Sequence, residues 1–564
     1  MTGSVAGSVV QLKTGVASAH VDSFAARGLP PAELQPAFLF ERPELAYPER
    51  LNCVTAFVDR HVAEGRGERT AILAPDGTHW TYADLAAEID RIANVLTGPL
   101  GLVAGNRVLL RAPNNPTMVA AYLAVIKAGG IVVATMPLLR AKELGQIVDR
   151  AEIALALCDD RLMDELTKTA GSSRFLKRVV AFSELKALAA SAAPTFTAVD
   201  TARDDVCLFG FTSGTTGEPK CTMHFHRDLL AICDAYARNV LKPTPDDRFI
   251  GSPPLAFTFG LGGLVLFPFR VGASTVLLEK ASPGDLLPAI ATYKPTICFT
   301  APTAYRAMIP NLRDHDWRSL RKCVSAGEAL PKATFDAWEE ATGLKLMDGI
   351  GATEMLHIFI SAPEEEIRPG ATGKPVPGYE AKVIGADGED LPPGKPGRLA
   401  VRGPTGCRYL ADDRQRKYVV NGWNVTGDTY VRDEDGYFWY QARNDDMIVS
   451  AGYNIAGPEV EAALLAHPTV AEAGVVGQPD PERGMIVKAY VVPKPDVTVT
   501  PALVVELQSF VKNEIAPYKY PREIAFVPSL PRTETGKLQR FALRERAARE
   551  AGEASSAGLP KAAE

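Results

Sequence analysis

The segment Thr212–Lys220 holds the densest group of phosphate-binding residue types in the chain. It consists of Thr-Ser-Gly-Thr-Thr-Gly-Glu-Pro-Lys and follows the apolar run Val206–Phe211, which predicts a strand. Glycines let backbone N–H groups turn toward an anion, hydroxyls add hydrogen-bond donors, and the lysine adds positive charge. A Walker A loop is excluded because Lys220 is followed by Cys221, where that motif has Ser or Thr. The segment therefore predicts a phosphate-binding loop rather than a plain surface turn.

Two other catalytic patterns fail on inspection. His226-Arg-Asp-Leu229 resembles the catalytic loop of protein kinases, but Cys233 stands where that loop has Asn, and the chain has no Asp-Phe-Gly. A Gly-x-Ser-x-Gly elbow is also absent from the sequence, which excludes the nucleophile of an α/β-hydrolase.

The elements that must position these residues alternate between strand-like and helix-like patterns. Such alternation predicts an α/β fold with βαβ units and a buried parallel sheet. From about Ala371 the pattern becomes β-rich, and a last α+β block runs from about Asp446 to Glu550. We predict a large N-terminal domain (1–442) of parallel βαβ subdomains plus a β-rich subdomain, a hinge (443–446), a small mobile α+β C-terminal domain (447–550) and a disordered tail (551–564). The strands expected are 107–112, 131–136, 153–158, 296–300 and 322–326, and the helices expected are 116–128, 141–151, 302–309 and 332–341.

Composition places the chain among soluble globular proteins. It has 564 residues, 46% hydrophobic and 23% charged, and a net charge of −6, which argues against a nucleic-acid or membrane-surface binder. Its eight cysteines lack the spacing of a disulfide framework or a zinc site, so buried free thiols and a cytoplasmic location are expected. Ile250–Phe269 is free of charge but contains several Gly and Pro residues, which favours a buried loop-and-helix segment lining a pocket over a membrane span.

Five motifs in order resemble those of the adenylate-forming superfamily, which comprises acyl- and aryl-CoA synthetases, peptide-synthetase adenylation domains and luciferases. With the flanking sequence, the resemblance covers residues 50 to 548. The motifs are Thr212–Lys220, Gly351–Glu354, Thr426–Asp428, Arg443–Asp446 with Gly452–Asn454, and Pro531–Lys537.

The resemblance implies an ATP site and a catalytic lysine. Activation of a carboxylate at the α-phosphate of ATP brings negative charges together, so cations and dipoles must neutralise them. Lys537 corresponds to the catalytic lysine, Glu354 to the Mg²⁺ ligand and Thr353 to a phosphate contact. Ile350 departs from the pattern, because many members have an adenine-stacking aromatic residue there. The implied nucleotide-binding residues are Thr212, Ser213, Gly214, Thr215, Thr216, Gly217 and Lys220 for phosphate, Gly327, Glu328 and Asp348 for adenine, and Asp428 and Arg443 for ribose.

Domain movement is a second implication. In the superfamily, the small domain rotates about a hinge residue after adenylation, because one cavity must serve two half-reactions. Asp445 corresponds to that hinge, and Gly452 and Tyr453 correspond to the lining of the CoA tunnel. We therefore expect ATP and Mg²⁺ as cofactors and CoA as a co-substrate.

The acid pocket follows from a narrower resemblance. Glu354–Ile358 resembles benzoate-type CoA ligases, and Ser18–Asp22, Gly406–Leu410 and Ser450–Gly457 resemble 2-aminobenzoate-CoA ligases. An aromatic side chain among small residues suits a flat apolar ring. The residues implied around the ring are Thr258, Phe259, Ala326, Gly351, His357 and Ile358.

The expected function is an ATP-dependent aryl-CoA ligase, an AMP-forming acid–thiol ligase acting on a small aromatic carboxylate. The sequence leaves open a medium-chain fatty acyl-CoA ligase and an adenylation enzyme that serves a carrier protein. It also leaves open whether His357 meets a ring substituent or is a core histidine, and whether the enzyme is a monomer or a homodimer.

Overall fold

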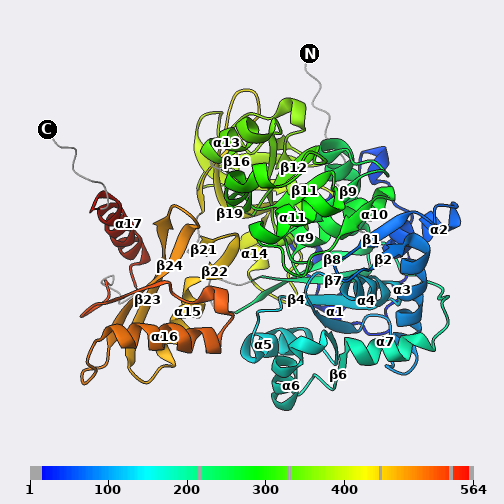
Figure 1. Cartoon of the computed structure of the whole chain (residues 1–564), viewed down its shortest axis with the longest axis horizontal. Coiled ribbons are helices and arrows are strands. Elements are labelled where there is room, and N and C mark those ends of the chain that lie inside the picture. The colour runs from blue at the N-terminus through cyan, green and yellow to red at the C-terminus, as the bar shows by residue number, and fades with distance from the viewer. Residues whose placement is uncertain are drawn as a thin grey trace. The chain divides into compact units, whose positions relative to one another are not determined.

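The computed structural model describes residues 16–212, 218–327, 330, 332–443, 447–531 and 538–557. The described chain divides into two compact units (Figure 1). The second unit begins at Arg443, and residues 138–147 and 218–219 group with it; the rest of the described chain before Arg443 forms the first unit.

Three sheets build the first unit. A six-stranded sheet has the order β6-β5-β3-β4-β7-β8 and is parallel except for the β7–β8 pair. Its strands are β3 (Arg107–Arg111), β4 (Ile131–Thr135), β5 (Leu155–Cys158), β6 (Arg178–Ala181), β7 (Val206–Thr212) and β8 (Lys220–Phe225).

A nine-stranded sheet has the order β15-β14-β13-β12-β11-β9-β10-β1-β2, with a parallel centre and antiparallel strands at both ends. A five-stranded antiparallel sheet follows it in the chain. The strands of the two sheets are β1 (Thr70–Leu73), β2 (His79–Thr81), β9 (Arg248–Gly251), β10 (Ser274–Val276), β11 (Ile297–Thr300), β12 (Lys322–Ser325), β13 (Leu346–Gly351), β14 (Ile358–Ser361) and β15 (Lys374–Pro375), then β16 (Glu380–Ile384), β17 (Pro396–Arg402), β18 (Val419–Val420), β19 (Trp423–Arg432) and β20 (Phe438–Arg443).

Helix α4 (Pro116–Lys127) packs against β3 and β4 of the six-stranded sheet and against helix α3. All of its residues are buried, since it is apolar on every side, which is the pattern of a central helix. It begins at Pro116, and the Asn115 side chain caps it by accepting a hydrogen bond from Met118 N–H. The other helices of this part of the chain are α1 (Phe24–Gly28), α2 (Arg60–Ala63), α3 (Tyr82–Thr97), α5 (Ala141–Ala151), α6 (Met163–Ser172), α7 (Phe182–Ala190), α8 (His226–Ile232), α9 (Thr258–Leu261), α10 (Phe267–Val271), α11 (Pro283–Tyr293), α12 (Pro302–Met308), α13 (Lys332–Thr342) and α14 (Gln415–Tyr418).

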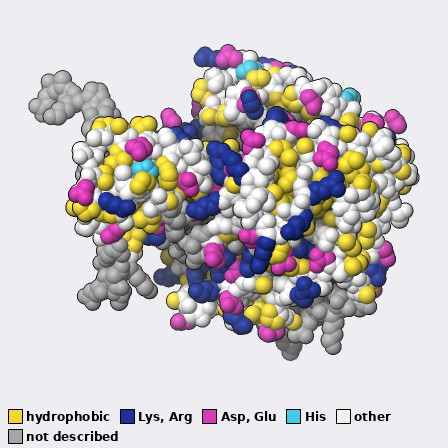
Figure 2. Space-filling model, turned by 90° about the horizontal axis from the view of Figure 1, so that it is seen from below, with side chains coloured by type: hydrophobic (Ala, Val, Ile, Leu, Met, Phe, Trp, Pro, Cys, Tyr) yellow, Lys and Arg dark blue, Asp and Glu magenta, His cyan; other side chains and the backbone are white. Residues whose placement is uncertain are grey.

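The uncharged segment Ile250–Phe269 forms the end of β9, a loop, α9, the π-helical turn η6 (Gly262–Leu266) and the start of α10. Its glycines allow close packing, because a Cβ on Gly263 would lie 2.6 Å from the Phe299 ring. No described helix is long and apolar enough to cross a membrane. On the face shown in Figure 2, basic and acidic side chains intersperse.

The second unit contains a hairpin and a three-stranded sheet. Strand β23 pairs antiparallel with β24, which pairs parallel with β25, and the helices α15 and α16 pack against them. Its elements are β21 (Met447–Ser450), β22 (Tyr453–Ala456), α15 (Gly457–Leu465), β23 (Val470–Asp480), β24 (Gly484–Pro493), α16 (Pro501–Glu514), β25 (Glu523–Phe526) and α17 (Arg540–Ala557).

The predicted disordered tail (551–564) needs a correction. Helix α17 continues past Glu550 to Ala557, because alanine and glutamate favour helix and Glu550 anchors the helix. Its carboxylate accepts hydrogen bonds from Lys488, Tyr490 and Arg546. Residues 558–564 lie outside the described residues.

The predicted α/β class is confirmed, with large parallel sheets, an antiparallel sheet and a separate C-terminal unit. All eight cysteines are free thiols and all are buried, as the sequence predicted.

Candidate active site

The described ends of the phosphate loop are the last paired residues of the β7–β8 hairpin. Thr212 ends β7 and pairs with Lys220, the first residue of β8. This register brings the predicted phosphate-binding hydroxyl and lysine opposite each other across the two strands. Ser213, Gly214, Thr215, Thr216 and Gly217 lie outside the described residues, so their role stays a prediction.

Strand β7 also contacts the turn that carries Thr353 and Glu354. A Cβ on Gly210 would lie 2.6 Å from Cγ2 of Thr353, so only glycine lets the strand pass this close. His224 of β8 donates from Nε2 to the Thr353 carbonyl at 2.8 Å. The structure therefore brings the base of the phosphate loop and the predicted metal-binding turn together.

Glu354 is the one carboxylate of that turn, and it is 9% exposed. Tyr409 donates a hydrogen bond to its Oε1 at 2.5 Å, whereas Oε2 accepts none from the described residues. Mg²⁺ requires oxygen ligands and takes one or two carboxylates beside substrate phosphates. A buried carboxylate with one oxygen fixed and the other open fits such an ion, so Glu354 is the residue that could hold it.

The predicted adenine contacts that the structure describes lie on or just after the neighbouring strands β12 and β13, and the predicted ribose contacts lie on the neighbouring strands β19 and β20 of another sheet. Burial raises the pKa of Asp348 on β13 to about 7, and hydrogen bonds from Gly349 N–H and the Ser325 hydroxyl offset only part of that. Gly327 follows β12 with φ +90°, which favours glycine at this turn. Asp428 lies on β19 and Arg443 ends the adjacent β20. Glu328 lies outside the described residues.

The His357 side chain packs against three aromatic rings. Its ring centroid is 4.6 Å from that of Phe267, 5.6 Å from Tyr236 and 5.7 Å from Phe259. The side chain is 2% exposed, and burial lowers its pKa from 6.5 to about 3. The nearby Phe259 backbone offsets only part of this effect, and neither ring nitrogen makes a well-formed hydrogen bond to a described residue. Burial therefore favours the neutral imidazole.

Small residues make room for this imidazole and join it to the rest of the predicted acid pocket. A Cβ on Gly262 would lie 2.3 Å from Cδ2 of His357, and a Cβ on Gly351 would lie 2.9 Å from its carbonyl carbon. Gly351 pairs with Ile358 across β13 and β14. Ala326 and Ile358 belong to one buried core, against which Phe259 packs.

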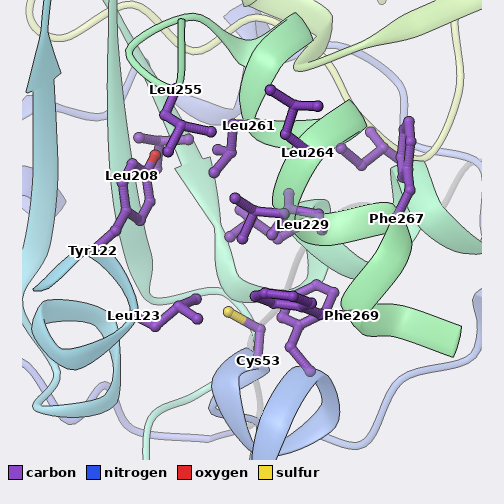
Figure 3. Packing of buried hydrophobic residues seen from close by; sticks show 14 of the residues in the cluster. Cys53, Tyr122, Leu123, Leu208, Leu229, Leu255, Leu261, Leu264, Phe267 and Phe269 are labelled. Carbon is purple, nitrogen blue, oxygen red and sulfur yellow. The ribbon is translucent and has the colours of Figure 1, made fainter. Parts of the chain in front are cut away.

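An apolar pocket links the acid-binding and phosphate-binding predictions. Thr258 from the predicted acid pocket and Thr353 from the predicted phosphate contacts both line it. Figure 3 shows Tyr122, Leu208, Leu255 and Leu261 in one part of the buried core, with Leu264 further along it. The other lining residues are Tyr122, Ala134, Leu208, Phe209, Gly210, Phe211, Leu255, Ala256, Phe257 and Leu261.

The remaining predictions fall in or near the second unit. Gly452 has φ +81°, and Tyr453 stacks on Tyr518 with ring centroids 4.3 Å apart. Asp445 and Lys537 lie outside the described residues, so the hinge and the catalytic lysine stay predictions.

Sequence reasoning missed several residues that the structure places at the site. Tyr409 and Thr405 contact the predicted metal-binding turn from about fifty residues further along the chain, and no spacing signals this. The structure also shows a cysteine–histidine cluster that the sequence did not predict. The side-chain sulfur and nitrogen atoms of Cys53, Cys207 and His226 lie within 4.8 Å of one another.

Comparison with known proteins identifies the class. Residues 59–409 match the AMP-binding enzyme family, and residues 459–537 match the AMP-binding enzyme C-terminal domain. The chain therefore belongs to the AMP-binding enzyme family. This confirms the predicted adenylate-forming superfamily and, with it, an AMP-forming acid–thiol ligase.

Individual relatives cover almost the whole chain. A benzoate–CoA ligase from Thauera aromatica is 35% identical over 513 residues, which is 89% of this chain and 97% of the relative. A mitochondrial acyl-coenzyme A synthetase from Homo sapiens is 33% identical over 487 residues, 83% of each chain. The crystal structure of an anthranilate CoA ligase in complex with anthranoyl-AMP superimposes with a TM-score of 0.71 at 35% identity, covering 91% of this chain and 100% of that one.

Proposed function

We propose that this enzyme is an ATP-dependent aryl-CoA ligase that activates an aromatic carboxylate of the benzoate or 2-aminobenzoate type. One observation carries the choice of an aromatic acid, namely the neutral His357 among the rings of Phe259, Phe267 and Tyr236. Aromatic walls suit a flat ring, and an imidazole that is not charged can donate to or accept from a ring substituent without requiring a counter-ion. The relatives named as benzoate and anthranilate CoA ligases support the same choice.

The proposed reaction has two steps, adenylation of the acid and transfer of the acyl group to CoA. First, a carboxylate oxygen forms a bond to the α-phosphorus of ATP while the bond from that phosphorus to pyrophosphate breaks. The CoA sulfur then forms a bond to the acyl carbon of the aryl-adenylate, the bond from that carbon to the AMP oxygen breaks, and the thiol proton leaves to solvent.

The residues of this chain take roles that follow from their chemistry. Thr212, Thr353 and Lys220 bind phosphate oxygens, and Asp428 accepts hydrogen bonds from the ribose hydroxyls. Glu354 holds Mg²⁺, which when bound neutralises phosphate charge. Lys537 contributes a compact positive charge to the transition state without forming a covalent bond.

The small domain then supplies the second half-reaction. In this proposal, it rotates about Asp445, which removes Lys537 and brings Gly452 and Tyr453 to the pantetheine arm of CoA. A cytoplasmic location is in keeping with eight free, buried thiols.

Pyrophosphate release with a panel of carboxylates, with and without CoA, tests the proposal. We expect turnover of benzoate and 2-aminobenzoate with thioester as the product. Preference for octanoate would favour a medium-chain acyl-CoA ligase instead. A single turnover that needs no CoA and yields no thioester would favour an adenylation enzyme that serves a carrier protein.

The variant Lys537→Ala separates the two steps. It is expected to abolish adenylate formation while retaining thioester formation from supplied aryl-adenylate, and equal loss of both would contradict the assigned role. Lys494→Ala, at an exposed lysine of the same unit, is the matched control and should retain both activities.

A further inference from the structure

The turn Thr353–Met355 is held at each of its three residues by a side chain from another part of the fold. His224 Nε2 donates to the Thr353 carbonyl at 2.8 Å, and Thr405 Oγ1 donates to the Met355 carbonyl at 2.7 Å. Tyr409 donates to the Glu354 carboxylate between them at 2.5 Å. His224 and Thr405 are 0% exposed and Tyr409 is 1% exposed, so water does not compete for these bonds.

The backbone of the turn requires such support. Leu356 follows it with φ +69°, in the left-handed region that a bulky residue seldom adopts. A residue in such a conformation persists only where the surrounding structure fixes it. The three hydrogen bonds therefore hold Glu354 on a segment that would not keep this shape by itself.

Tyr409 differs from the other two because it binds a side chain rather than a carbonyl. A carboxylate can only accept, so the Tyr409 hydroxyl is the donor in its 2.5 Å hydrogen bond to Glu354. It therefore fixes Oε1 and leaves Oε2 of Glu354 for a metal ion. The ring face also lies 5.5 Å from the Nζ of Lys220, within range of a cation–π contact.

Tyr409 is itself anchored firmly. Its backbone N–H donates to Gln415 Oε1 at 2.9 Å, and its backbone pairs with Thr222 on β8. The preceding residue, Arg408, is fully buried and forms a 2.7 Å ion pair with Asp228. Because its backbone is held in this way, Tyr409 can define the positions of the Glu354 carboxylate and the Lys220 ammonium group, which are far apart in the sequence.

We propose that Tyr409 is a positioning residue that orients Glu354 for Mg²⁺ and places Lys220 toward the nucleotide phosphates. The inference rests on the proposed function, because it assigns the metal to Glu354. Residues that orient a metal ligand in this way typically change metal affinity or activity by about 10–100-fold when they are altered.

The test uses Tyr409→Phe, which removes the hydroxyl and keeps the ring against Lys220. The control is Tyr82→Phe, because Tyr82 is also fully buried and its hydroxyl donates to a carbonyl, that of Ala273, at 2.7 Å. Binding of α,β-methylene-ATP is measured by calorimetry with excess Mg²⁺ and with EDTA. The ratio of the two affinities gives the Mg²⁺-dependent part without any turnover.

We expect this ratio to fall about 10-fold or more in Tyr409→Phe and to stay unchanged in Tyr82→Phe. The loss should not add to that of Glu354→Gln in the double variant, since both changes act on one ligand. An unchanged ratio in a folded Tyr409→Phe protein, or losses that add, would refute the inference. Absence of pyrophosphate release by the unaltered enzyme with every carboxylate would instead refute the proposed function.

Discussion

The free energy of unfolding of the first unit is expected to fall between pH 7.0 and 5.0. Replacing His357 with glutamine is expected to reduce this fall by about 2 kcal/mol. His357 is 2% exposed, and burial lowers its pKa from 6.5 to about 3. In the unfolded chain a histidine binds a proton below about pH 6.5, whereas in the folded protein His357 stays neutral until the pH approaches 3. Unfolding therefore takes up a proton between these values, so stability is complete above pH 6.5 and is lost as the pH falls.

The magnitude follows from the same shift. At pH 5.0 the unfolded histidine is about 1.5 pH units below its pKa, and each unit corresponds to about 1.36 kcal/mol. The folded side chain is still neutral at that pH, so protonation of the unfolded chain lowers the free energy of unfolding by the full difference of about 2 kcal/mol. At pH 7.0 the corresponding loss is close to zero.

Tryptophan fluorescence provides the assay. All five tryptophans precede Arg443 and lie in the first unit, so urea unfolding followed by their emission reports that unit alone. The change in unfolding free energy between pH 7.0 and 5.0 is compared for the unaltered protein and for His357→Gln. His79→Gln is the control because His79 is exposed.

The variant should lose about 2 kcal/mol less than the unaltered protein over this pH interval, and the control should lose the same as the unaltered protein. Equal losses in all three proteins would show that His357 becomes protonated in the folded state. That result would refute the neutral imidazole on which the choice of an aromatic substrate depends. His357→Phe gives a second test if the glutamine variant folds poorly.

Three further predictions concern the same unit. Gly262→Ala should cost about 1–3 kcal/mol in chemical denaturation because its Cβ would overlap His357, whereas Gly171→Ala, in helix α6 with nothing within 4 Å, should change stability by about 1 kcal/mol at most; equal effects would contradict the close packing. Arg408→Met should cost about 3–5 kcal/mol, because it removes the 2.7 Å ion pair of the buried Asp228 and, among the described arginines and lysines, leaves that carboxylate only Arg227, at 3.9 Å. A second change of that Asp to Asn should recover part of the loss in a thermal melt. Burial raises the pKa of Asp348 to about 7, so its contribution to stability is lost as the pH rises from about 4 through 7. The free energy of unfolding of Asp348→Asn, relative to that of the unaltered protein, should therefore rise over this interval and stay constant above it. Parallel pH profiles of the two proteins would argue against the raised pKa.

Local elements could be predicted from the sequence because they depend on short patterns. The helix expected at 116–128 is α4 (Pro116–Lys127), and the strand expected at 131–136 is β4 (Ile131–Thr135). The order of strands in the sheets could not be derived in this way. Strand β8, for example, pairs antiparallel with β7 at the edge of a parallel sheet, which depends on contacts between distant segments.

The site divides in the same way. Roles for residues within recognisable motifs, such as Thr212 and Glu354, could be predicted from sequence alone, and these roles stay predictions. Tyr409 could not, because its role depends on a contact with a residue 55 positions earlier. The protonation state of His357 also required the structure, since only the surrounding rings reveal that its charged form is excluded.

The burial of all eight thiols has a consequence for an enzyme that makes a reactive acyl group. An aryl-adenylate is an electrophile that any accessible thiolate could capture, which would leave the enzyme acylated on its own cysteine. Burial raises the pKa of Cys221, directly after Lys220, well above its ordinary value, so this thiol is a poor nucleophile. Cys53 is the exception, because the neighbouring Cys207 and His226 lower its pKa to about 6, yet it is fully enclosed. Within the proposed chemistry, all eight cysteine thiols are thus kept from the aryl-adenylate, and the thiol of CoA is left as the acceptor.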